Sequence, residues 1–170
     1  MPKLIKDAQF VENDWQLVSA EAQPDEVLSL KASHLLVPFT LWQEHKAELA
    51  KLNAEIGVWF ASEQNPAELL TEEEIGQLPV IALDFPLFKD GRAFTYAALL
   101  REQKSYSGDI RAVGEVLRDQ LSYMLSCGFS SFQVADDVDE ETYLNGFHDF
   151  SENYQATVIK PTPLFRRRQV

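Results

Sequence analysis

The sequence predicts one α/β domain built on a mainly parallel sheet of about five strands. Short apolar runs bounded by turn residues alternate with helical patterns, which is typical of βαβ units. The 170 residues are enough for a single domain with its own core. A complete eight-fold βα barrel takes at least about 200 residues. We therefore expect an open or partial-barrel sheet with right-handed crossovers.

The first sixteen residues predict a small β-hairpin that precedes the alternating segments. The stretches KLIK (3–6) and QFVE (9–12) flank Asp7-Ala8, a short polar turn. Residues 19–33 are polar and contain proline, so we expect a loop there with one short helical turn.

Five apolar runs predict the parallel strands, and helical patterns separate them. The expected strands are 34–39, 56–60, 78–85, 108–113 and 129–134. The expected helices are 40–52, 65–70, 94–103, 114–128 and 139–155. Thr40, Asn65 and either Asp137 or Asp139 are the expected N-caps of three of these helices, and Gly128 is an expected helix end.

Composition excludes several classes of protein. The net charge of −12 repels nucleic acid and anionic membranes. No apolar run reaches the ~18–20 residues that span a bilayer, and the start does not resemble a signal peptide. We expect a cytoplasmic protein. Cys127 is the only cysteine, so the chain alone forms no disulfide and no cysteine-ligated zinc or iron–sulfur site.

The sequence shows no evident cofactor or metal site. It contains neither a phosphate-binding loop nor the glycine-rich dinucleotide fingerprint. His34, His45 and His148 are scattered without metal-ligand spacing. Whether the chain is an enzyme stays open at this point.

Charged residues gather where the third predicted strand gives way to a helix. The strand ends at Asp84, and Lys89, Asp90, Gly91 and Arg92 follow before the helix. Ligands of parallel α/β sheets bind beyond the carboxyl ends of the strands. We therefore expect ligand contacts at Lys89, Asp90, Gly91 and Arg92, with Gly91 allowing a tight turn.

The next strand contains Arg111 among apolar residues and leads into Glu115 and Asp119. A guanidinium inside a sheet needs a carboxylate or a ligand anion. One interpretation is a structural ion pair with Asp84. The other is a small-oxyanion site formed by Arg92 and Arg111, with Asp84 or Glu115 as a catalytic acid or base.

The motifs around these charges resemble a bacterial family known as domain of unknown function 934. Its members have D-F-P-x-F-x-D-G-R, which matches residues 84–92, then L-R at 100–101. They continue with R-A-x-G-[DE]-V-x-x-D-Q, which matches 111–120, and G-F at 128–129. The matching positions include Asp119 and Gln120, which are further candidate ligand-binding residues. Thr95 stands where many relatives have serine.

The resemblance implies a role in sulfur assimilation, because the family is labelled a probable oxidoreductase involved in sulfite reduction. One cysteine cannot hold the iron–sulfur cluster of the reductase itself. We therefore expect an accessory protein, with sulfite reductase or another sulfur-assimilation protein as partner. The alternative is a non-catalytic adaptor that docks through its acidic surface and the aromatic last helix.

Two further expectations concern assembly. An uncovered sheet edge would favour a homodimer. The basic segment 160–170, with Arg166, Arg167 and Arg168, is expected to be a solvated tail, and a docking segment is the alternative.

Overall fold

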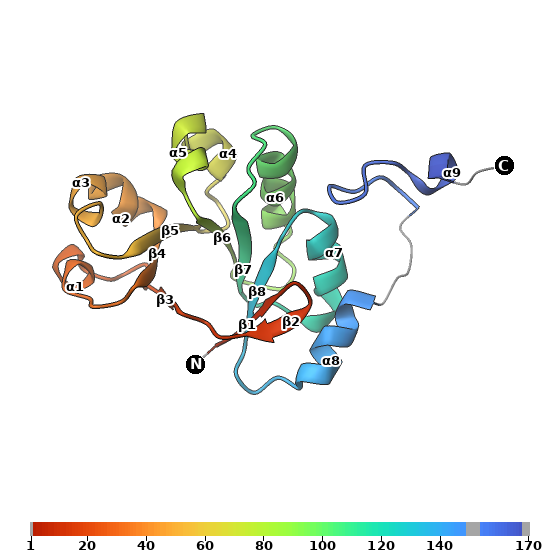
Figure 1. Ribbon diagram of the computed structural model, residues 1–170, viewed down its shortest axis with the longest axis horizontal. Coiled ribbons are helices and arrows are strands. Elements are labelled where there is room, and N and C mark those ends of the chain that lie inside the picture. Colours follow the sequence, from red (N-terminus) through yellow and green to blue (C-terminus); the bar gives the residue numbers. More distant parts are fainter. Residues whose placement is uncertain (1, 149–153, 168–170) are drawn as a thin grey trace.

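The computed structural model describes residues 2–148 and 154–167. An eight-stranded sheet curls into an open half-barrel, and helices cover its outer face (Figure 1). The strand order is β2-β1-β8-β7-β6-β5-β4-β3. The strands are β1 (Lys3–Lys6), β2 (Gln9–Val11), β3 (Trp15–Leu17), β4 (His34–Pro38), β5 (Glu55–Phe60), β6 (Val80–Phe85), β7 (Asp109–Gly114) and β8 (Ser131–Val134).

Strands β3 to β8 run parallel, whereas β1 is antiparallel to both β2 and β8. The helices are α1 (Pro24–Leu28), α2 (Phe39–Glu44), α3 (Lys46–Leu49), α4 (Pro66–Leu69), α5 (Glu72–Gln77), α6 (Arg92–Glu102), α7 (Leu121–Ser126), α8 (Glu140–Asn145) and α9 (Leu164–Arg167). Short 3-10 turns at Arg118–Gln120 and Gly146–His148 flank α7 and α8.

The α/β class is confirmed, and the five predicted parallel strands are β4 to β8. The hairpin is also confirmed: Asp7 and Ala8 both adopt positive φ, 52° and 54°, as a tight hairpin turn requires. The count of about five strands was too low. The hairpin joins the main sheet through β1–β8 pairing, and the short β3 adds an edge strand beside β4.

Two of the three predicted N-caps are confirmed. Asn65 accepts from Ala67 N, and Asp139 accepts from Thr142 N. Thr40 is not a cap, because α2 begins at Phe39 and no side chain caps it.

The last predicted helix is shorter than expected, because α8 ends at Asn145. Phe147 follows in a 3-10 turn, is only 8% exposed, and packs edge-on against Phe132 with ring centroids 5.2 Å apart. Tyr154 lies outside any helix, and the predicted stripe position Phe150 lies outside the described residues. Of the expected aromatic docking face, Phe147 is therefore part of the core, whereas Tyr154 is exposed.

The two faces of the sheet have separate apolar clusters, because side chains alternate along each strand. The outer face packs residues such as Ile81, Leu83 and Phe85 under the helices. The inner face holds a smaller cluster of four buried residues flanked by two half-buried tryptophans: Leu36, Val80, Ala82, Val113, Trp15 and Trp59. Polar groups on the inner face therefore lie among buried side chains rather than in open water.

Candidate functional site

Asp84 lies at the carboxyl end of β6 on the inner face, opposite Val113 of β7. It is half-buried, and among the described residues none donates a hydrogen bond to its carboxylate. Burial raises the pKa of Asp84, and the negative charges of Glu63 and Asp90 raise it further. The adjacent Gly114 has φ +88°, and a Cβ there would come within 2.5 Å of Asp84 Oδ1.

Asp90 and Arg92 form a forked ion pair at the start of α6. Arg92 Nε lies 2.9 Å from Asp90 Oδ1, and Arg92 Nη2 lies 2.6 Å from Oδ2. The same Nη2 donates to Ser62 Oγ at 2.8 Å, just beyond strand β5. The hydrogen bonds from Arg92 lower the pKa of Asp90 far below its ordinary value. Both members of the pair are thus already satisfied within the chain.

Ser62 connects the rim of the sheet to α6. Its hydroxyl is next to Glu63, at 3.5 Å from Oε2, and its carbonyl accepts from Tyr96 Oη at 3.2 Å. Ser62 is itself buried. Neither Ser62 nor Glu63 was among the predicted site residues, although both follow a predicted strand at its carboxyl end.

The loop between β6 and α6 is held at one residue, Phe88, through both of its main-chain polar groups. Glu115 Oε2 accepts from Phe88 N at 2.9 Å, and Gln120 Nε2 donates to Phe88 O at 2.9 Å. The side chains of Leu87 and Phe88 are nevertheless 51% and 60% exposed. Glu115 and Gln120 therefore fix a loop that presents two apolar side chains to solvent.

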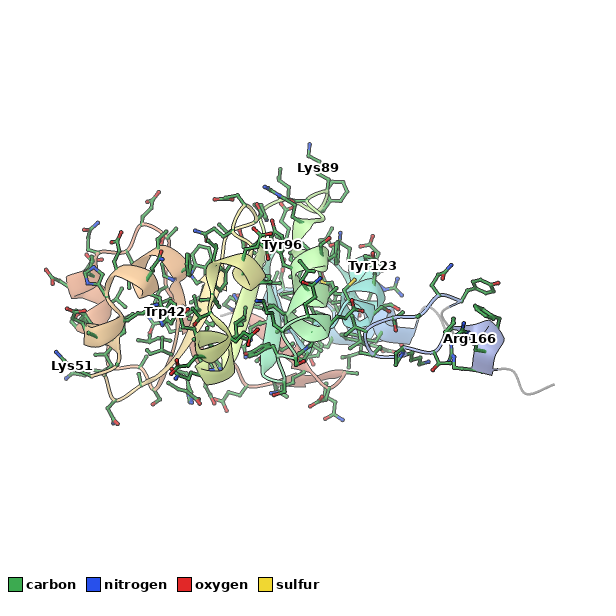
Figure 2. All side chains as sticks on the ribbon, turned by 90° about the horizontal axis from the view of Figure 1, so that it is seen from above. Trp42, Lys51, Lys89, Tyr96, Tyr123 and Arg166 are labelled. Carbon is green, nitrogen blue, oxygen red and sulfur yellow. The ribbon has the colours of Figure 1, made fainter. Side chains whose placement is uncertain are left out.

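The remaining predicted loop residues play smaller parts. Lys89 extends into solvent at the tip of the loop (Figure 2). Gly91 has φ −91°, which any residue adopts, so the expected need for glycine in a tight turn was wrong. Asp119 is exposed on the 3-10 turn and is one of the charges that raise the pKa of Tyr143.

Arg111 does not pair with Asp84. It pairs with Asp109, two residues earlier on β7, with Nη2 2.9 Å from Oδ2, and its Nε donates to Ser131 Oγ at 3.0 Å. The guanidinium lies 5.5 Å from the Trp15 ring and is 2% exposed. Side chains two apart on a strand share a face, which explains this partner.

The structure thus brings Asp84, Asp90 and Arg92 to one rim with Ser62 and Glu63, and leaves Arg111 inside the sheet. The two arginines share no partner among the described residues. The carboxylates of Glu63, Asp84 and Asp90 lie near one another at this rim, and Arg92 forms an ion pair with Asp90. Such a rim attracts cations more readily than anions.

Two searches of the described residues bear on other classes of site. Within residues 2–148 and 154–167, no group of three or more histidine, cysteine, aspartate or glutamate side chains is arranged to hold a metal ion. No helix in this part of the chain has the length and apolar character needed to cross a membrane.

Comparison with known proteins identifies the family. Neither curated proteins nor solved structures gave a significant match. The family described as "Bacterial protein of unknown function (DUF934)" matches residues 57–165, well over half of the chain, and this stretch includes the whole rim from Ser62 to Gln120. The chain therefore belongs to this bacterial family of unknown function.

Proposed function

We propose that this protein is a non-catalytic accessory protein that docks to a partner protein through the β6–α6 loop, residues 86–91. The observation that carries the proposal is that the main chain of Phe88 is held at both its N–H and its C=O. Its N–H and C=O are both fixed by side chains from the next βα unit, while the Phe88 ring stays exposed. Two side-chain hydrogen bonds thus fix the position of a residue whose ring is not packed in the core.

A fixed aromatic side chain suits protein recognition. Aromatic anchors dominate binding energy at interfaces, and a loop ordered before binding loses less entropy on docking. Leu87 adds a second exposed apolar group beside Phe88. The loop thus supplies a small apolar anchor on a rigid support.

Charge indicates the chemistry of the partner. The carboxylates of Glu63 and Asp90 lie near that of Asp84, which ends the strand before this loop, and the whole chain carries a net charge of −12. Complementary charge speeds encounter and selects partners. We therefore expect a partner with an apolar recess bordered by arginine or lysine.

Assimilatory sulfite reductase is the first partner to test. The family resemblance carries a label of sulfite reduction, and one cysteine does not support an iron–sulfur cluster in this chain. The role we propose is therefore that of an accessory to the reductase. Docking of the acidic rim onto a basic surface of the reductase would account for such a role.

Titration calorimetry with the reductase of the same bacterium tests the proposal. Phe88→Ala should weaken binding by about thirty-fold, because hot-spot truncations cost about 2 kcal/mol or more. Phe165→Ala is the matched control, since Phe165 is similarly exposed, at 57%, but lies on α9. Equal losses in both variants, or no binding by the parent chain, would contradict the proposal.

One observation favours a second candidate, an enzyme in which Asp84 is the general acid. Its half-buried carboxyl has a raised pKa and no donor among the described residues, as catalytic acids often do. The acidic rim then favours a cationic or neutral substrate. A thermal-shift panel of small amines, sulfite, sulfate and phosphate separates the candidates, because only the enzyme should be stabilised by a small molecule at the rim.

A further inference from the structure

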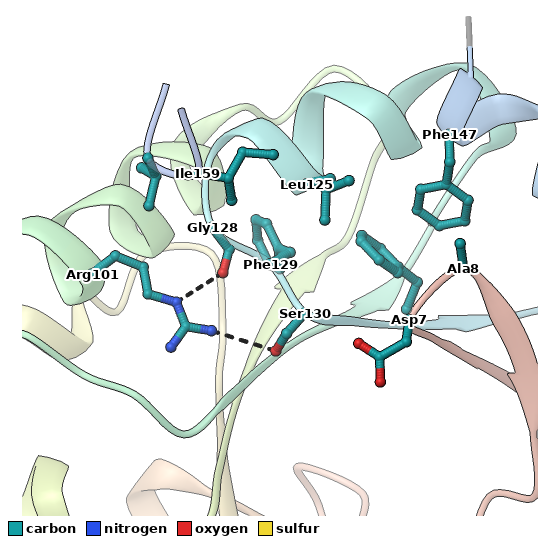
Figure 3. A pocket seen from close by; sticks show the side chains of 11 residues that line it. Asp7, Ala8, Arg101, Leu125, Gly128, Phe129, Ser130, Phe147 and Ile159 are labelled. Atoms are coloured by element: carbon teal, nitrogen blue, oxygen red, sulfur yellow. Dashed lines mark hydrogen bonds between the residues drawn. The ribbon is translucent and has the colours of Figure 1, made fainter. Parts of the chain in front are cut away.

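A cavity of about 460 Å³ lies at the end of the sheet opposite to the rim. Its walls come from α6, α7, the segment before β8, the β1–β2 turn and residues 158–159 (Figure 3). A volume of this size falls in the range of small-molecule sites. The apolar lining consists mainly of Leu125, Phe129, Phe132, Phe147, Val158 and Ile159.

The C-terminal segment forms part of this wall. Val158 N donates to Ser126 O at 3.1 Å, at the end of α7, and a side chain at Gly128 would touch Val158. The cavity therefore lies between the sheet and a segment that is anchored to α7. Ile159, partly exposed at 48%, borders its opening.

Arg101 places a positive charge on the wall without a carboxylate partner. Its Nε donates to Gly128 O at 3.0 Å, and Nη1 donates to the carbonyls of Tyr106 and Gly108 at 2.6 and 2.8 Å. Nη2 makes only a 3.4 Å contact with Ser130 Oγ. Among the described residues, no carboxylate oxygen accepts a hydrogen bond from this guanidinium.

The nearest acid beyond the wall is already engaged. Ser130 Oγ gives its proton to Asp109 Oδ1 at 2.6 Å, and the other oxygen of Asp109 accepts from Arg111 and Ser131. Burial lowers the pKa of Arg101, and Tyr106 and the charge of Asp109 offset this only in part. Nη2 thus keeps donor capacity facing Ser130, at the cavity lining (Figure 3).

From this geometry we infer that the cavity binds a small amphipathic monocarboxylate, with an aliphatic or phenylalkyl body. The body packs against the apolar lining, and the carboxylate accepts from Arg101 Nη2 and supplies its missing counter-charge. Among the described lining residues Asp7 is the only acid, and in Figure 3 it lies across the cavity from Arg101. The site is separate from the rim, so the inference does not depend on the proposed function.

Paired ligands that differ only in the head group test the inference. Octanoate is compared with octanol, and hydrocinnamate with hydrocinnamyl alcohol, by amide chemical-shift titration of the full chain. Each acid should bind about tenfold or more tightly than its alcohol, because a charge-assisted hydrogen bond is gained. The shifts should include Gly128 and Ser130. Equal binding of acid and alcohol, no binding, or shifts confined to the rim would overturn the inference.

Two variants avoid Arg101 itself, whose three bonds to main-chain carbonyls make it a structural residue as well. Leu125 lines the cavity and is partly exposed on α7. The larger side chain of Leu125→Trp should fill the cavity and abolish binding of both acids. Asp7→Asn keeps the turn, because asparagine tolerates positive φ, and should tighten acid binding while leaving alcohol binding unchanged. Persistent binding in Leu125→Trp would place the ligand elsewhere and refute the inference.

Discussion

Arg111 and Asp109 form an ion pair along a single strand, with Arg111 Nη2 2.9 Å from Asp109 Oδ2 and both side chains less than a tenth exposed. Ser130 and Ser131 each donate to the same carboxylate. Burial alone would raise the pKa of Asp109, but these hydrogen bonds and the charge of Arg111 lower it. The pair and the two serines form one polar unit on the inner face of the sheet, and within the described part of the chain only Arg111 Nη1 of this unit is buried without a hydrogen-bond partner.

Removing the negative charge of Asp109 should lower the free energy of unfolding. Asp109→Asn leaves a buried guanidinium uncompensated, so we expect a loss of about 3–5 kcal/mol in the free energy of unfolding. Urea denaturation measures it. The double variant Asp109→Asn with Arg111→Met should recover much of the loss. A double variant that is less stable than Asp109→Asn would show that Arg111 has a favourable role beyond this pair.

The pKa of Asp84 predicts a pH dependence of the opposite kind from that of Asp109. Its folded-state pKa is raised above the ordinary 3.8, so the folded protein binds the proton more tightly than the unfolded chain. The protonated carboxyl of Asp84 therefore contributes to the free energy of unfolding below pH 3.8. This contribution is lost as the pH rises from 3.8 through the raised pKa of the folded state. Asp84→Asn should raise the melting temperature at neutral pH and have little effect below 3.8. A melting temperature lowered by Asp84→Asn at pH 7 would contradict this account.

Gly114 should not tolerate a side chain. Its φ is +88°, and a Cβ would come within 2.5 Å of both Phe85 O and Asp84 Oδ1. Gly114→Ala should cost at least about 1–3 kcal/mol from backbone strain alone, as measured by urea denaturation. Gly76→Ala, within α5, is the control, because a Cβ there would meet no heavy atom within 4 Å apart from its chain neighbours and the backbone of its own helix. That variant should gain about 0.5–1 kcal/mol.

The order of the β6–α6 loop should depend on Glu115. Glu115→Ala frees the Phe88 amide, so hydrogen exchange at Phe88 should accelerate while global stability falls by only about 1 kcal/mol. Glu44→Ala, at an exposed position of α2, should change neither quantity. Unchanged exchange at Phe88 in Glu115→Ala would show that the loop is held by Gln120 alone.

The sequence pattern predicted those helices, strands and turns that depend mainly on residues close together in the chain. The five parallel strands and the hairpin turn follow from alternation and turn residues, and the rim follows from the rule that parallel strands carry sites at their carboxyl ends. The pairing of β1 with β8 joins Lys3 to Val134, and no local signal marks so distant a contact. The three residues of β3 are too few to form a pattern.

The partner of Arg111 was predictable and was missed. Asp109 precedes it by two positions in a predicted strand, so the strand period alone places both side chains on one face. Asp84 was favoured because it ends the neighbouring strand. The register instead aligns Arg111 with Ala82 and Asp84 with Val113. Ser62 and Glu63 lie just beyond the carboxyl end of a predicted strand, and Asp84 lies at the carboxyl end of another. The rule that sites lie at the carboxyl ends of parallel strands identified Asp84, and it applies equally to Ser62 and Glu63.

The first seventeen residues flank the sheet on both sides, since β1 and β2 lie beyond β8 and β3 lies beyond β4. On a ribosome that adds ~5–20 residues per second, roughly 6–25 seconds pass between the synthesis of β1 and that of β8. During that time Leu4 and Ile5, buried in the finished fold, stay in contact with water. We therefore expect the long sequence separation of β1 and β8 to slow folding, and chaperones that shield the newly made β1–β2 hairpin should raise the yield of folded protein.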